Sequence, residues 1–139
     1  MWHDYIISMV VKKKPSLDLS PFKVHQEKIT KELQDYLSQH EKGTVAVYGA
    51  GHQALAILAL AQLSGNIKYV LDDAPFKQNK YTPATHIPIV SAKVLKTDPP
   101  SAIIVMAASY SNEVVQKLQK ANLNIDLAIL TDYGLKIIE

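Results

Sequence analysis

The feature that most constrains this chain is an apolar run, Val45–Tyr48, that meets the turn Gly49-Ala50-Gly51 and continues into an alanine- and leucine-rich stretch. This order predicts a strand, a tight turn and a helix. Glycines let the backbone of such a turn approach a ligand closely, and the first N–H groups of the helix can bind an anion. The pattern therefore favours a small nucleotide-binding α/β domain.

Further apolar runs alternate with helical patterns along the chain and set the fold class. The run Ala102–Met106 is continuously apolar, as expected of a parallel strand that is covered on both faces. The alternation predicts an α/β, Rossmann-like, mainly parallel sheet of at least four strands flanked by helices. The predicted strands are 44–48, 67–71, 102–106 and 125–130, the predicted helices are 20–43, 52–64, 91–96 and 112–121, and 132–139 is a tail that can add a short edge element.

The N-terminal part is predicted to lie outside this sheet. Tyr5–Val11 is rich in β-formers and is followed by three lysines and Pro15, which indicates a strand with a charged exit. We interpret residues 1–16 as a strand and linker, a candidate for the end of a preceding domain, and residues 17–139 as the Rossmann-like domain. Ser20 is predicted to cap the first helix, with Pro21 at its first position.

Composition limits the possible classes of function. The chain has 139 residues, of which 47% are hydrophobic, so it forms one domain with a real core. A net charge of +2 and scattered lysines do not indicate nucleic-acid binding. There is no cysteine, which fits a reducing cytoplasm, and Ile6–Val11 is too short to span a membrane. We expect a cytoplasmic domain with no nucleic-acid and no membrane partner.

Three strand ends are predicted to line one rim of the sheet, where open α/β sheets bind ligands. Asp72 follows Gly51 at about the interval of a ribose-binding acid, although any short βαβ unit produces this spacing and no third glycine follows. The loop 74–88 leaves the same rim and is either functional or a solvated excursion; its position favours function. The candidate substrate-binding residues are Gly49, Ala50, Gly51, His52, Gln53, Asp72, Asp73, Lys77, Gln78, Tyr81, His86, Ser109 and Tyr110.

No set of side chains amounts to a catalytic or metal site. Asp72 and Asp73 are adjacent, so in a strand they point to opposite sides and do not form an acid–base pair. The five histidines show no metal-ligand spacing. Ser109 has no nucleophile-elbow motif around it. We predict no catalytic residue and no metal ligand.

Three segments together resemble the C-terminal domain of sugar C-methyltransferases, which use S-adenosylmethionine to methylate a carbon of nucleotide-linked keto-sugars. They are Tyr48–Gly51, Tyr69–Asp73 and Pro75–Ile89, the last similar to the family's N-P-x-K-x-G-x-Y-x-P-G-T-H-I-P-I stretch. The resemblance covers roughly residues 17–130, and Tyr5–Val11 resembles the end of the methyltransferase domain that precedes this one in the family. The chain departs from the family at Asn79 and Ala84, where glycines are usual, at Gln53-Ala54, where Lys-Gly is usual, and at Ala107–Tyr110, where Pro-Trp-Asn-Tyr is usual.

The resemblance implies a division of labour. In such enzymes the cofactor site and the catalytic base lie in preceding domains, and the C-terminal domain helps to hold the substrate. It implies that this chain binds no cofactor, that a preceding methyltransferase domain binds S-adenosylmethionine, and that the partners are this domain and a nucleotide-linked sugar. The chain alone is then not expected to methylate. Two alternatives are the nucleotide-sugar-binding domain of a sugar acyltransferase or epimerase-like polysaccharide enzyme, and an interaction module without a ligand.

Overall fold

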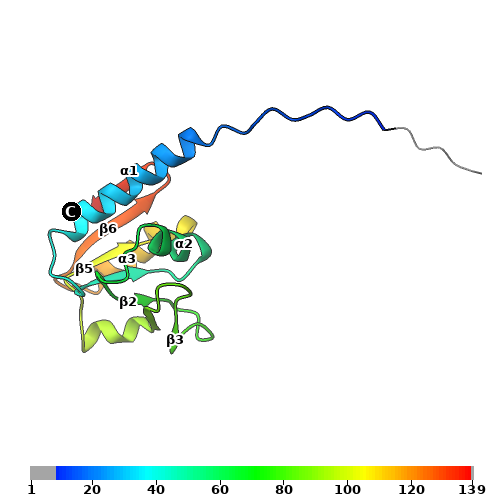
Figure 1. Ribbon diagram of the computed structural model, residues 1–139. Coiled ribbons are helices and arrows are strands. Elements are labelled where there is room, and N and C mark those ends of the chain that lie inside the picture. Colours follow the sequence, from blue (N-terminus) through cyan, green and yellow to red (C-terminus); the bar gives the residue numbers. More distant parts are fainter. Residues whose placement is uncertain (1–8, 139) are drawn as a thin grey trace, which may run out of the picture.

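A single seven-stranded sheet in the order β3-β4-β2-β1-β5-β6-β7 organises the chain (Figure 1). The computed structural model describes residues 9–138. The central strands β4, β2, β1, β5 and β6 are parallel, and β3 and β7 add antiparallel edges. The Rossmann-like prediction is confirmed. The elements are α1 (Ser20–Leu37), β1 (Val45–Tyr48), α2 (His52–Leu60), β2 (Ile67–Leu71), β3 (Lys80–Tyr81), β4 (Pro88–Val90), η1 (Ala92–Lys96), β5 (Ala102–Val105), η2 (Ala108–Tyr110), α3 (Ser111–Lys120), β6 (Asp126–Thr131) and β7 (Gly134–Ile138).

Helices cover both faces of the sheet, so the central strands are apolar on both sides. Alternate residues of β1 point to opposite faces: Val45 and Val47 pack with α1 and α2, whereas Ala46 and Tyr48 pack with α3 and η1. All four residues of β1 are buried, as are all four of β5. This two-sided burial explains why these strands are continuous apolar runs in the sequence.

The N-terminal predictions are only partly correct. Tyr5–Ser8 lie outside the described residues, and Met9–Val11 are exposed and belong to no strand. The predicted strand is therefore wrong for its described part, because the edge strands β3 and β7 pair only with their inner neighbours. Ser20 does not cap α1: it is the first helical residue, and its N–H and hydroxyl both donate to Asp18 Oδ1, at 2.9 and 2.6 Å.

Two helices end earlier than predicted. After the first the chain turns to make a backbone hydrogen bond, and after the second it turns to bury a side chain. Helix α1 ends at Leu37, and Gly43, with φ +72°, donates its N–H to the Asn66 carbonyl at 3.2 Å. Helix α2 ends at Leu60, and the left-handed residue Gln62 redirects the chain so that Leu63 is buried.

The C-terminal tail and the long loop both contribute strands. The tail forms β7, which pairs with β6 through a tight turn, as predicted for an edge element. Helix α1 is tied to this hairpin, since Glu32 Oε2 accepts the Leu135 N–H at 2.8 Å. The segment predicted as a loop contains β3, which pairs with β4, and β4 extends the parallel sheet beside β2.

Candidate functional site

Two neighbouring pockets open where β1, β2 and β5 end, at the predicted rim. They share Gly51, His52 and Lys77, and nine of the thirteen candidate residues line one or the other. The turn pocket, about 430 Å³, is lined by Gly49, Gly51, His52, Gln53, Asp72, Lys77, Met106, Ala107, Ala108 and Tyr110. The hairpin pocket, about 410 Å³, is lined by Ala50, Gly51, His52, Leu55, Phe76, Lys77, Lys80, Tyr81 and Ile89.

Gly49 sets the shape of the turn that separates β1 from α2. Its φ is +113°, and a Cβ atom there would lie 2.6 Å from the Met106 carbonyl oxygen. Its N–H donates to the Leu71 carbonyl at 2.8 Å, so the turn is fixed between the ends of β2 and β5. Ala54, where dinucleotide folds place a glycine or alanine for close packing of helix on strand, is fully buried. The turn therefore keeps the compact form of a nucleotide-binding fold.

The Asp72 carboxylate lies under this turn and accepts hydrogen bonds from three donors. Its Oδ2 accepts the Ala50 N–H at 2.8 Å and the Lys77 ammonium at 3.0 Å, and its Oδ1 accepts the Ala74 N–H at 2.9 Å. Burial alone would raise the pKa of Asp72, but the hydrogen bonds from Ala74, Ala50 and Lys77 outweigh it and hold the pKa below 3.8. Asp72 is thus a fixed carboxylate. The neighbouring Gln78 supports it indirectly, by donating from Nε2 to the Asp72 carbonyl at 2.9 Å.

Asp73 points to the other face of the sheet, as predicted for adjacent strand residues. Its Oδ2 accepts the Tyr48 hydroxyl at 2.9 Å and the Lys117 ammonium at 2.8 Å. The bond from Lys117 lowers the pKa of Asp73, and burial raises that of Tyr48. Neither Tyr48 nor Lys117 was among the candidate residues. This cluster ties α3 to β1 and β2 beside the rim, outside both pockets.

The remaining candidates, His86 and Ser109, are exposed and line neither pocket. His86 lies at the tip of the β3–β4 hairpin, with its ring 6.3 Å from the Tyr81 ring. The candidate set also leaves out several residues of the pocket lining that the folded hairpin and turns bring to the rim. These are Leu55, Phe76, Lys80, Ile89, Met106, Ala107 and Ala108.

Much of the sequence motif in the β3–β4 hairpin serves to shape the loop. The buried Thr82 hydroxyl accepts the Ile87 N–H at 2.9 Å and lies 2.6 Å from the Thr85 hydroxyl. Asn79 and Ala84 have φ values of +60° and +64°, the left-handed region that favours glycine. This explains why the resembling family has glycine at both positions. The backbone at both positions keeps a conformation that suits glycine, although this chain has asparagine and alanine there.

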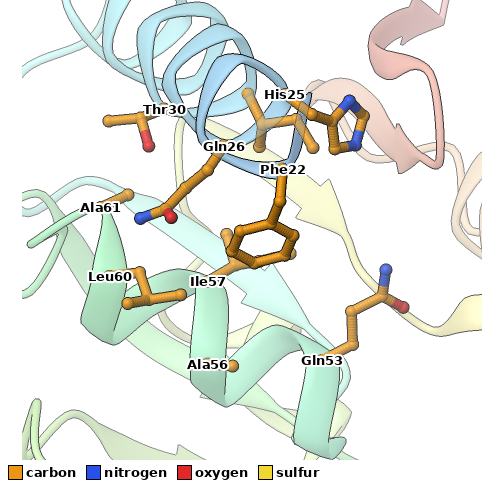
Figure 2. A pocket seen from close by; sticks show the side chains of 10 residues that line it. Phe22, His25, Gln26, Thr30, Gln53, Ala56, Ile57, Leu60 and Ala61 are labelled. Atoms are coloured by element: carbon orange, nitrogen blue, oxygen red, sulfur yellow. The ribbon is translucent and has the colours of Figure 1, made fainter. Parts of the chain in front are cut away.

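A third pocket, about 250 Å³, lies between α1 and α2 and differs in character (Figure 2). Phe22 reaches from α1 toward Ile57 and Leu60 of α2, and Gln26 and Gln53 flank them. Its lining residues, all within the described chain, are apolar or uncharged polar apart from His25. An anionic ligand finds two lysines at the rim and none here, so the rim pockets are the candidate site.

The described residues 9–138 show neither a metal centre nor a membrane-spanning helix. Over this range no group of three histidine, aspartate or glutamate side chains is arranged to hold a metal ion. Over the same range no helix is both long and apolar enough to cross a membrane.

Comparison with known proteins places the chain in a family. No curated protein sequence gives a significant match. Among solved structures, UDP-D-quinovosamine 4-dehydrogenase from Vibrio fischeri is similar, with 22% identity and a TM-score of 0.53 over 71% of this chain and 95% of that chain. At this identity the likeness shows the fold alone. The model of the family described as C-methyltransferase C-terminal domain matches residues 16–125, most of the chain. This chain therefore belongs to the C-methyltransferase C-terminal domain family.

Proposed function

We propose that this domain binds the nucleotide-linked sugar substrate of an S-adenosylmethionine-dependent C-methyltransferase and does not itself transfer the methyl group. The observation that carries the proposal is the convergence of two lysines and two aromatic rings on the hairpin pocket, directly beside the turn pocket. Membership of the family supports the link to C-methylation. The structural neighbour is named as an enzyme of a UDP-sugar, which agrees with this class of ligand.

The two pockets suit the two halves of such a ligand. In the hairpin pocket, Lys77 and Lys80 supply positive charge for phosphates, and the exposed rings of Phe76 and Tyr81 offer flat surfaces for a base. In the turn pocket, Asp72 and Gln53 can accept or donate hydrogen bonds to sugar hydroxyls. The turn between them lets a ligand span both pockets along Gly51 and His52.

The chemistry of the rim favours binding over catalysis. A general base works best when its pKa is near the operating pH. Asp72 is the one carboxylate that lines these described pockets, and its donors hold its pKa below 3.8, so it is a weak base. Methyl transfer then requires a preceding methyltransferase domain, which supplies S-adenosylmethionine and the base. A cytoplasmic location belongs to the same proposal and agrees with the lack of cysteine.

Calorimetry with UDP-glucose and dTDP-glucose tests the binding role. Replacing Lys77 and Lys80 together by methionine is expected to weaken binding at least about tenfold, because each lysine offers a charge-assisted hydrogen bond to phosphate. The matched control Lys93→Met removes an exposed charge from η1, which lines neither pocket, and is expected to leave binding unchanged.

A second assay tests the division of labour. The purified chain, incubated with S-adenosylmethionine and each of these sugar nucleotides, is expected to give no methylated product by mass spectrometry. A methylated product would contradict the proposed role. If neither sugar nucleotide gives a heat of binding in the calorimetry, the alternative of an interaction module without a ligand is favoured.

A further inference from the structure

Lys77 and Asp72 lie at the junction of the two pockets and neutralise each other. The Lys77 ammonium is 3.0 Å from Asp72 Oδ2, and Lys77 lines both pockets, whereas Asp72 lines only the turn pocket. The lysine side chain is 31% exposed and the aspartate side chain 11%. One member of the pair is therefore accessible from both sides, and the other is nearly enclosed.

The two members differ in how firmly they are held. The Ala50 and Ala74 N–H groups fix one oxygen each of the Asp72 carboxylate, so its position does not depend on Lys77. The Lys77 ammonium ends a flexible four-carbon stem; it hydrogen-bonds to Asp72 and lies 5.9 Å from the centre of the Phe76 ring. Movement of Lys77 would leave a positioned carboxylate with room for another donor, because a carboxylate has about four acceptor sites.

We propose that ligand binding exchanges the partners of this pair. Lys77 leaves Asp72 for a ligand phosphate in the hairpin pocket, and a ligand hydroxyl takes the vacated place on Asp72 in the turn pocket. This inference rests on the proposed function. It narrows the class of ligand to molecules that carry both a phosphate group, which reaches the hairpin pocket, and a hydroxyl group, which reaches the turn pocket. The hydroxyl comes from either the ribose or the attached sugar.

The exchange makes the two contacts interdependent. A phosphate without a hydroxyl draws Lys77 away and leaves Asp72 one donor short. A hydroxyl without a phosphate must displace the Lys77 ammonium while offering it no anion in exchange. An ion pair whose lysine is about one-third exposed is worth no more than about fivefold in an equilibrium, so a phosphate can compete for the lysine. Only a ligand with both groups gains both contacts.

Calorimetry on three variants tests the exchange with inorganic pyrophosphate, UDP, 2′-deoxyuridine diphosphate and UDP-glucose. In Asp72→Asn, Lys77 is no longer paired, so pyrophosphate is expected to bind about three- to fivefold more tightly than to the unaltered chain. UDP-glucose is expected to gain nothing, because the released lysine is offset by the lost carboxylate. Lys77→Met is expected to weaken pyrophosphate at least about tenfold.

The matched control is Lys80→Met, which removes a charge from the hairpin pocket without touching Asp72. It is expected to weaken pyrophosphate equally in the presence and absence of Asp72→Asn. If UDP loses affinity on removal of its 2′-hydroxyl, the ribose supplies the hydroxyl. If it does not, and Asp72→Asn tightens the binding of UDP as it does that of pyrophosphate but not that of UDP-glucose, the attached sugar supplies it.

The outcomes separate the exchange from the proposed function. If the unaltered chain binds UDP-glucose but Asp72→Asn binds pyrophosphate no more tightly than the unaltered chain does, the exchange is overturned and the proposed function stands. No binding of UDP-glucose by the unaltered chain overturns both. If Asp72→Asn does not fold, ¹⁵N NMR of the unaltered chain decides: UDP-glucose must move the Lys77 Nζ resonance and leave the Ala74 amide, bound to Asp72 Oδ1, in place. An unmoved Lys77 resonance contradicts the exchange.

Discussion

The backbone N–H of Ala50 donates to Asp72 Oδ2 at 2.8 Å, across 22 residues of sequence. This bond joins the turn after β1 to the end of β2, and Asp72 also accepts the Ala74 N–H. The carboxylate that we propose as a ligand contact therefore also holds the rim together. Under that proposal, one side chain contributes to both stability and binding.

Asp72→Asn is expected to lower the free energy of unfolding by about 1–3 kcal/mol at pH 7, because an amide has one oxygen for the Ala50 and Ala74 N–H groups. The pKa of Asp72 is lowered on folding, so its contribution is fully present above the unfolded value of 3.8 and is lost as the pH falls through the folded value. Urea unfolding at a series of pH values checks this. Asp35→Asn, at an exposed carboxylate of α1, is the control. A difference between Asp72→Asn and the unaltered chain that does not shrink as the pH falls below 3.8 would contradict the account.

Gly49→Ala is expected to cost at least about 2 kcal/mol of unfolding free energy, through its positive φ and a clash with the Met106 carbonyl. Gly51→Ala is the matched control, because a Cβ there has nothing within 4 Å and its φ is −86°. Thermal unfolding of both variants measures the difference. Equal melting temperatures would show that the turn does not need glycine at position 49.

The sheet was predictable where burial alone marks the strands. β1 and β5 are buried on both faces and therefore stand out as continuous apolar runs. β3 and β4 have only two and three residues, too few to show a strand pattern in the sequence. They are strands because they pair with each other and because β4 pairs with β2. The helix ends at Leu37 and Leu60 were missed because later residues, Gly43 and Leu63, decide where the chain turns.

Ala84→Gly is expected to raise the free energy of unfolding by about 0.5–1 kcal/mol, because Ala84 has a φ of +64° and alanine is strained there. Asn79→Gly is the comparison at φ +60°, where asparagine is tolerated, so its change should be smaller. Urea unfolding of the two variants measures both effects. A loss of stability in Ala84→Gly would show that the alanine side chain makes a favourable contact that outweighs the strain.

Tyr36→Phe is expected to stabilise the domain by about 1 kcal/mol. Within residues 9–138 the buried Tyr36 hydroxyl finds no hydrogen-bond partner, and burial raises its pKa to about 12. Tyr69→Phe is the matched control, since the equally buried Tyr69 hydroxyl donates to the Asp98 carbonyl at 2.7 Å and its loss should be destabilising. Opposite shifts in melting temperature are predicted; two shifts of the same sign would contradict the assignment.

The candidate site was predictable where local sequence forms it and not where distant segments meet. Gly49 to Gln53 belong to one turn, and their place at the rim follows from the strand before them. Lys80 and Phe76 reach the rim only through the hairpin, which was predicted as a loop. Lys117 was missed because its partner, Asp73, lies 44 residues away and no local pattern connects them.

Chemical-shift mapping of the ¹⁵N-labelled chain with UDP-glucose and dTDP-glucose tests the central claim, that the rim holds a nucleotide-linked sugar. The account predicts saturable amide shifts in Gly49–Gln53 and Phe76–Tyr81, the two segments that supply much of the lining of the rim pockets. It predicts unmoved amides along the α1 side of the third pocket at Phe22–Thr30. Shifts confined to the pocket between α1 and α2, or no shifts with either nucleotide, would contradict it.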